Sequence, residues 1–197
     1  MTRSDAQDNT VATIACWQTH VNHVGASARM RSWLTDQMSL TVKLMQRSQQ
    51  FRVQRLSQRR APALQDEYER LALPRPLQVQ QREVLLRCDE RPVVYAHTVV
   101  PLTATASDWP FFGRLGERSL GTTLFGDPRV IRGRLEYARL SRRHPLLRRA
   151  AAALNEELPS FLYARRCLYR RRSGLLLVTE VFLPELAQIP ISAQMRK

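Results

Sequence analysis

Residues 79–100 read VQQREVLLRCDERPVVYAHTVV and decide the fold class of this 197-residue chain. Two runs rich in apolar residues, 79–88 and 93–100, flank the short polar stretch 89–92. This is the pattern of a β-hairpin with a short loop. Pro101 ends the second run, because proline cannot donate to a strand ladder.

A second hairpin is predicted near the other end of the chain, with strands over 162–171 and 175–183 around a Ser-Gly turn. A single strand is predicted from Phe51, where apolar and polar residues alternate, and another over 130–140. The strands are thus joined mainly by hairpins, which favours antiparallel pairing.

Helices are predicted between these strands. Residues 27–37 place apolar side chains on one helical face, a second short helix follows Ser39, and 145–158 are rich in helix formers. Residues 107–118 predict a helical turn, and 119–126, bounded by glycines, predict a loop or flap.

Together these elements predict an α+β fold, a largely antiparallel β-sheet flanked by helices that lie to one side of it. We expect one domain over 27–186, after a partly flexible N-terminal extension over 1–26. A short C-terminal tail over 187–197 completes the chain.

The net charge of +14 comes almost entirely from arginines that are spread along the chain. A basic chain favours anionic partners, including nucleic acid, acidic membranes or a small anion. No zinc-finger spacing, basic zipper or aromatic RNA-binding motif accompanies the arginines. A solvated arginine-rich surface is therefore the favoured interpretation, and no nucleic-acid partner is predicted.

The three cysteines, Cys16, Cys88 and Cys167, are widely spaced, so we predict buried free thiols in a reducing compartment. No apolar stretch approaches the roughly 20 residues that a membrane helix needs. We predict a cytoplasmic monomer without an integral membrane segment.

Two charged residues stand in apolar strands. Arg82 shares a strand face with Val84 and Leu86, and Glu180 shares one with Val178 and Phe182. A guanidinium fork in such surroundings suits a carboxylate ligand, although a surface arginine at a strand end is the commoner case. A buried carboxylate must be paired, protonated or functional, so for Glu180 a structural ion pair with Arg82 or another arginine is equally open.

The four histidines, His20, His23, His97 and His144, do not form a metal-binding pattern, and surface positions are expected for them. No glycine-rich nucleotide fingerprint or nucleophile elbow is present. We therefore predict neither a metal nor another cofactor.

Taken in order, several runs resemble the chorismate lyase family, from about Trp33 to Pro184. They are Trp33-Leu34 followed by Met38, Arg82-Glu83-Val84-Leu85-Leu86, Thr98-Val99-Val100-Pro101, Leu120-Gly121, and Thr179-Glu180-x-Phe182-Leu183-Pro184. The resemblance implies an antiparallel sheet with flanking helices and a buried site under two flaps. It also implies cofactor-free elimination of pyruvate from chorismate to give 4-hydroxybenzoate, the first step of ubiquinone biosynthesis.

The resemblance implies that substrate contacts fall on Met38, Arg82, Leu120 and Glu180, with Arg82 and Glu180 catalytic. Two departures are visible. The family often has an arginine at His97, so one anion contact is expected to be weaker here or to be supplied by another arginine, and 141–160 is longer than expected. A non-catalytic domain that binds an aromatic carboxylate is the alternative.

Overall fold

The computed structural model describes residues 14–190, so the predictions for 1–13 and 191–197 lie outside the described residues. Six strands form one antiparallel sheet in the order β1-β2-β3-β6-β5-β4. Their bounds are β1 (Phe51–Pro62), β2 (Gln78–Cys88), β3 (Arg91–Pro101), β4 (Val130–Ser141), β5 (Phe161–Arg171) and β6 (Gly174–Phe182). Both predicted hairpins are confirmed.

The helices are short and lie between the strands in the chain. They are α2 (Ala28–Leu34), α3 (Leu40–Met45), α4 (Leu120–Gly126) and α5 (Pro145–Leu154), with 3-10 turns η1 (Val21–Val24), η2 (Leu102–Ala104), η3 (Phe112–Arg114) and η4 (Pro184–Gln188). The α+β class is confirmed.

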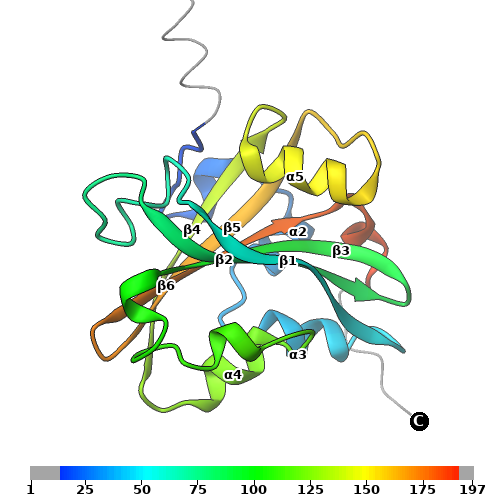
Figure 1. Cartoon of the computed structure of the whole chain (residues 1–197). Helices are drawn as coiled ribbons and strands as arrows, with labels where there is room; N and C mark the ends of the chain where they lie inside the picture. Colours follow the sequence, from blue (N-terminus) through cyan, green and yellow to red (C-terminus); the bar gives the residue numbers. More distant parts are fainter. Residues whose placement is uncertain (1–13, 191–197) are drawn as a thin grey trace, which may run out of the picture.

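The prediction that the helices lie to one side of the sheet is wrong. α5 lies on one side, and α3 and α4 lie on the other (Figure 1). α5 has its own apolar face, with Leu146, Leu147 and Ala150 buried against β4 and β5 residues. The sheet is therefore covered on both faces, and the central strand β3 is buried from Val93 to Pro101.

The prediction of a loop over 119–126 is also wrong, since this stretch forms α4. Leu120 and Leu124 stand one helical turn apart and are buried on the sheet, which gives the segment an apolar stripe. α5 ends at Leu154, earlier than predicted, because Asn155 adopts the left-handed conformation (φ 53°) that caps it.

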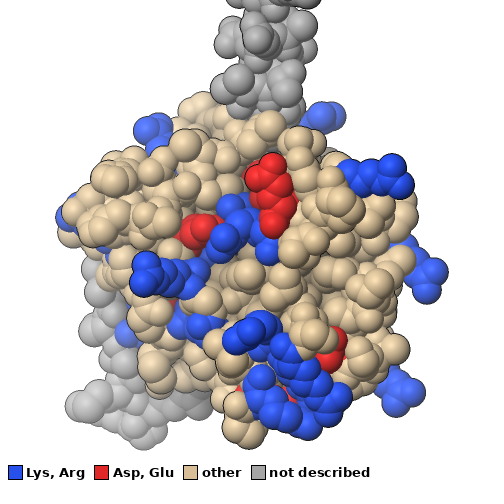
Figure 2. Space-filling view, turned by 90° about the vertical axis from the view of Figure 1, so that its left-hand side faces the viewer, with Lys and Arg blue, Asp and Glu red and all other residues tan. Residues whose placement is uncertain are grey.

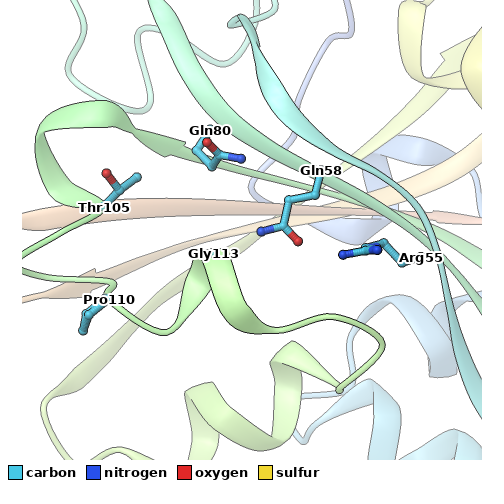
Figure 3. Close-up of a pocket in the computed structure, with 6 residues that line it drawn as sticks. All are labelled: Arg55, Gln58, Gln80, Thr105, Pro110 and Gly113. Carbon is cyan, nitrogen blue, oxygen red and sulfur yellow. The ribbon is translucent and has the colours of Figure 1, made fainter.

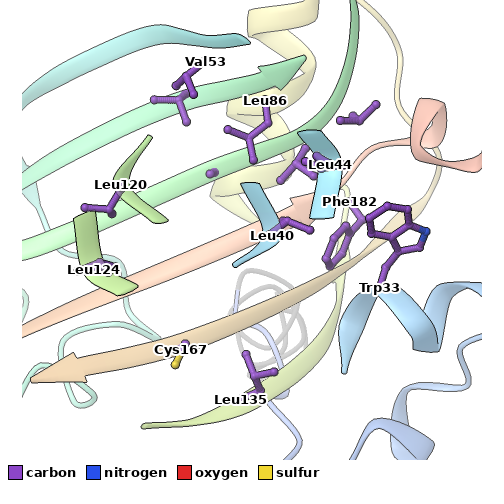
Figure 4. Close-up of a cluster of buried hydrophobic side chains, with 14 of the residues drawn as sticks. Trp33, Leu40, Leu44, Val53, Leu86, Leu120, Leu124, Leu135, Cys167 and Phe182 are labelled. Atoms are coloured by element: carbon purple, nitrogen blue, oxygen red, sulfur yellow. The ribbon is translucent and has the colours of Figure 1, made fainter. Parts of the chain in front are cut away.

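The larger core lies between the sheet and α2, α3 and α4 (Figure 4). Trp33 and Leu34 of α2, Leu40 and Leu44 of α3, and Phe182 of β6 are almost completely buried there. This core therefore fixes the helices that cover one face of the sheet.

Side chains are sorted between the two faces by the strand register. Arg82 lies opposite Thr98, and Glu83 lies opposite His97. Neighbours along a strand point to opposite faces, so Arg82 faces α3 and α4 while Glu83 and His97 face the α5 side. The sheet thus separates two sets of buried charges. The predicted domain bounds over 27–186 stay a prediction, although Val24 and Ala26 before them are buried.

Arginines also dominate the surface charge. Figure 2 shows one face on which Lys and Arg side chains gather, with a few acidic side chains beside them in an otherwise uncharged surface. No helix within residues 14–190 is long and apolar enough to cross a lipid bilayer.

Candidate active site

Arg82 projects from the middle of β2 and is 2% exposed. Its Nη2 donates to the carbonyl oxygens of Gly116 (3.0 Å) and Arg118 (2.9 Å), just before α4. Its Nε has no hydrogen-bond partner among the described residues, and no carboxylate within them pairs with it. Burial, together with the charge of Arg55, lowers the pKa of Arg82 to about 10. A buried cation with an unused donor is a binding group for an anion.

Glu180 lies on the same face, two strands from Arg82 and in the neighbouring row of side chains. Its Oε2 accepts a hydrogen bond from Nε of Arg165 on β5 at 2.5 Å. Of the two partners left open by the sequence, the structure selects another arginine rather than Arg82. The Glu180 side chain keeps 19% of its surface exposed, so the carboxylate is still accessible to a ligand.

Arg165 also holds the segment that links α2 and α3. Its Nη1 donates to the carbonyl oxygens of Trp33 (3.1 Å) and Asp36 (2.9 Å). Arg82 does the same for the segment before α4. The two guanidinium groups therefore fix the two covering segments in place over the sheet.

The other two predicted site residues lie on these covering segments. Leu120 begins α4 and is buried, at 7% exposure. Met38 lies in the loop before α3 and is 68% exposed, with its backbone N–H donating to Asp36 Oδ1 at 2.7 Å. The structure thus brings Arg82, Glu180 and Leu120 to one face, while the Met38 side chain points to solvent.

The two covering segments touch at their helix N-termini. Thr41 Oγ1 and Ser119 Oγ lie 2.7 Å apart, and the backbone of Gly121 comes close to α3. A Cβ atom at Gly121 would lie 2.9 Å from Ser39 Oγ and 3.2 Å from Thr41 Oγ1. Glycine at this position therefore permits the close contact between α3 and α4.

Gly121→Val is expected to lower the free energy of unfolding by about 1–2 kcal/mol, because the added side chain overpacks this contact. Urea denaturation measures the change. Gly126→Val in the same helix is the control, since nothing lies within 4 Å of a Cβ there. Equal effects of the two substitutions would contradict the close-contact explanation.

His97 does not face the site, so the prediction of a weakened anion contact at this position is wrong. It is fully buried on the α5 side of the sheet. Its Nε2 lies 3.1 Å from Glu67 Oε1, and its Nδ1 lies 3.4 Å from Glu83 Oε1. Both contacts pair the imidazole ring with a carboxylate inside the protein. Glu83 also accepts from Arg149 Nη1 at 2.8 Å.

These carboxylates keep His97 protonated. Burial opposes the imidazolium, but Glu67 and Glu83 outweigh it and raise the pKa of His97 to about 9. Burial likewise opposes ionisation of Glu83, yet His97 and Arg149 lower its pKa to about 2. His144 is also buried, against Asp66 at 3.2 Å. The expectation of surface histidines holds for His20 and His23 alone.

His97 should therefore make stability depend on pH. Its folded pKa exceeds the ordinary value of 6.5, so its contribution is present below pH 6.5 and is lost as pH rises through about 9. Between these values the free energy of unfolding should fall by about 2–3 kcal/mol more in the wild type than in His97→Gln. Urea denaturation across this pH range measures the difference, and His23→Gln, at an exposed position, should behave as wild type.

The cysteine prediction is partly wrong. Cys88 and Cys167 are buried free thiols, whereas Cys16 is exposed. Burial raises the pKa values of the Cys88 and Cys167 thiols. Neither thiol is therefore poised as a nucleophile.

A family model described as chorismate lyase matches residues 11–189, the range that holds both covering segments and the whole sheet. The chain belongs to the chorismate lyase family. A probable chorismate pyruvate-lyase from Ralstonia nicotianae is 52% identical over 158 residues, 79% of this chain and 81% of that protein. Another from Cupriavidus metallidurans is 47% identical over 176 residues, 87% and 81% of the two chains.

Two solved structures show the same fold at low identity. The C-terminal domain of PhnF has a TM-score of 0.52 at 16% identity and covers 68% of this chain and 83% of that one. The C-terminal domain of a histidine utilization repressor from Pseudomonas syringae pv. tomato has a TM-score of 0.51 at 9% identity, covering 75% and 100%. At such identities the likeness concerns the fold alone.

Proposed function

We propose that the chain is a chorismate pyruvate-lyase, which converts chorismate to 4-hydroxybenzoate and pyruvate. Membership of the chorismate lyase family and the named relatives support this activity. The structural observation that carries the proposal is Arg82, a buried cation without a carboxylate partner, on the same sheet face as Glu180. Chorismate carries a carboxylate that Arg82 can bind and a ring hydroxyl that Glu180 can contact.

The reaction breaks two bonds of chorismate. The hydrogen on the hydroxyl-bearing ring carbon leaves as a proton, and its bonding electrons complete the aromatic ring. The ether bond between ring and side arm breaks, and its electrons leave with the enolpyruvate oxygen. Protonation of the enolpyruvate methylene carbon then gives pyruvate, so atoms and electrons balance without an external oxidant or reductant.

We assign the residues to this reaction as follows. Arg82 binds the ring carboxylate, and Glu180 contacts the ring hydroxyl and orients it or moves a proton. The two groups project from strands two apart, about 10 Å, which suits a ring that carries carboxylate and hydroxyl at opposite ends. The site holds the reactive conformer and stabilises the charge of the departing group.

Leu120 and Met38 are the proposed apolar walls that exclude water. Leu120 is already buried at the start of α4. For Met38 the role requires its exposed side chain to turn toward the site when substrate binds. We further propose that the protein acts in the cytoplasm as a monomer, without nucleic acid, and supplies 4-hydroxybenzoate to ubiquinone biosynthesis.

The test is to mix the purified chain with chorismate and to follow the ultraviolet absorbance of 4-hydroxybenzoate. Pyruvate, measured with a coupled dehydrogenase, should appear in equal amount. Binding of chorismate without either product would contradict the proposal and would indicate a non-catalytic domain that binds aromatic carboxylates. DNA binding that weakens from the lower to the higher of two salt concentrations, without turnover of chorismate, would also contradict it.

A further inference from the structure

We propose that Arg55 is a second guanidinium of this site and binds the carboxylate of the substrate's enolpyruvyl arm. The inference rests on the proposed function, which makes the substrate a dianion with two separate carboxylates. The arm leaves the ring at the carbon next to the hydroxyl-bearing one, which Glu180 would hold. Its carboxylate must therefore extend back along the sheet, past the Arg82 guanidinium, to meet Arg55.

The strand register places Arg55 on the correct face. Arg55 lies opposite Val84, and Gln58 lies opposite Arg82. A bulge between Arg55 and Ser57 inserts one extra residue, so Arg55 and Gln58 both face the site although they are three positions apart. Arg55 also belongs to the row of cross-strand neighbours that leads through β2 and β3 to Glu180.

A pocket of about 350 Å³ opens beside these residues, between β1, β2 and the segment around η3 (Figure 3). This volume is within the range of small-molecule sites. Its lining residues are Arg55, Gln58, Gln80, Thr105, Pro110 and Gly113. The Gln58 side chain donates to the Phe112 carbonyl at 3.0 Å, while its Oε1 is buried without a partner among residues 14–190. The pocket therefore offers one cation, Arg55, and one buried oxygen of Gln58 that has no partner among the described residues.

Arg55 has no competing anion. Between residues 14 and 190 it makes no ion pair and no hydrogen bond, whereas the carboxylate of Glu180, three strands away, is engaged by Arg165. The charge of Arg55 contributes to the lowered pKa of Arg82. Arg55 lies opposite Val84, two positions along β2 from Arg82, so the two guanidinium groups share one sheet face, where a small dianion can contact both. Such a ligand relieves their repulsion, which a monoanion does only in part.

Arg55→Gln should raise the KM for chorismate about 10-fold, because a charge-assisted hydrogen bond is lost. The value of kcat should change less than about threefold, and Arg55→Lys should recover part of the affinity. Binding of 4-hydroxybenzoate, which lacks the arm, should stay within about twofold of the wild type by calorimetry. Arg59→Gln is the matched control, because Arg59 is exposed on the same strand and lies opposite Gln81, on the other face.

Two results would overturn this inference. One is a KM for chorismate in Arg55→Gln that equals that of Arg59→Gln. The other is an equal loss of affinity for chorismate and 4-hydroxybenzoate, which would mean that Arg55 does not distinguish the arm. Absence of turnover in the wild type would instead overturn the proposed function, and the two ligands would then be compared by calorimetry alone.

Discussion

Arg82→Ala is expected to lower kcat/KM for chorismate about 10³-fold, the largest loss of any single substitution on this sheet face. Removing one partner of a buried charge pair costs roughly 2–5 kcal/mol, and each 1.4 kcal/mol is a factor of ten. Both KM and kcat should suffer, since the ring carboxylate is held in the ground state and in the transition state. Steady-state kinetics by product absorbance measures the loss.

Arg82 also supports the segment before α4, and the experiment must separate this structural role from substrate binding. Its side chain satisfies the Gly116 and Arg118 carbonyl oxygens, so alanine also removes support from the segment before α4. Thermal unfolding of Arg82→Ala shows whether the fold survives. Arg118→Ala removes an arginine side chain from the same segment and should keep wild-type kinetics. A folded Arg82→Ala with undiminished turnover would end the assigned role.

Glu180→Gln is expected to lower kcat about 10²-fold and to change KM less than about threefold. The amide keeps the size and one acceptor of the carboxylate, but it cannot take a proton or stabilise positive charge. A loss confined to kcat identifies an interaction made in the transition state. The split between kcat and KM, from initial rates at several chorismate concentrations, is therefore the measurement.

The chain provides a close control for this substitution. Glu136 accepts from Arg166 Nε at 2.6 Å on the α5 side of the same sheet. Glu136→Gln on β4 removes a partner of Arg166, the β5 residue next to Arg165, and of Arg70, on the face away from the site. It should leave kcat near the wild-type value. If both variants lost kcat equally, the effect of Glu180 would be structural.

Much of the fold follows from local patterns in the sequence. The two hairpins are predictable because apolar runs flank short turns, and the shared face of Arg82 and Val84 follows from the period of two in a strand. The partner of Glu180 is not predictable in this way. Arg165 is identified only by the register of β5 against β6, and register depends on the whole sheet.

Other errors have a similar origin. Gly121 and Gly126 suggest a loop, yet this stretch forms a helix whose apolar side chains are buried on the sheet. A local preference is weaker than tertiary packing. His97 lies just before a run that resembles the family and departs from it, and its surroundings include Glu67 from a distant loop. The prediction that the helices cover only one side of the sheet failed because α5 packs on the opposite face from α3 and α4. The choice of face depends on strands that are distant from α2 in the chain.

The alternation of side chains along β2 and β3 constrains how this protein can change during evolution. Arg82 and Glu83 are adjacent and point to opposite faces, as do His97 and Thr98. Inserting or deleting one residue within β2 would turn the Glu83 carboxylate toward the substrate and the Arg82 guanidinium toward the α5 side, and the same change in β3 would turn His97 toward the substrate. Length variation among descendants should therefore accumulate in the connections between strands, while these two strands keep a constant length.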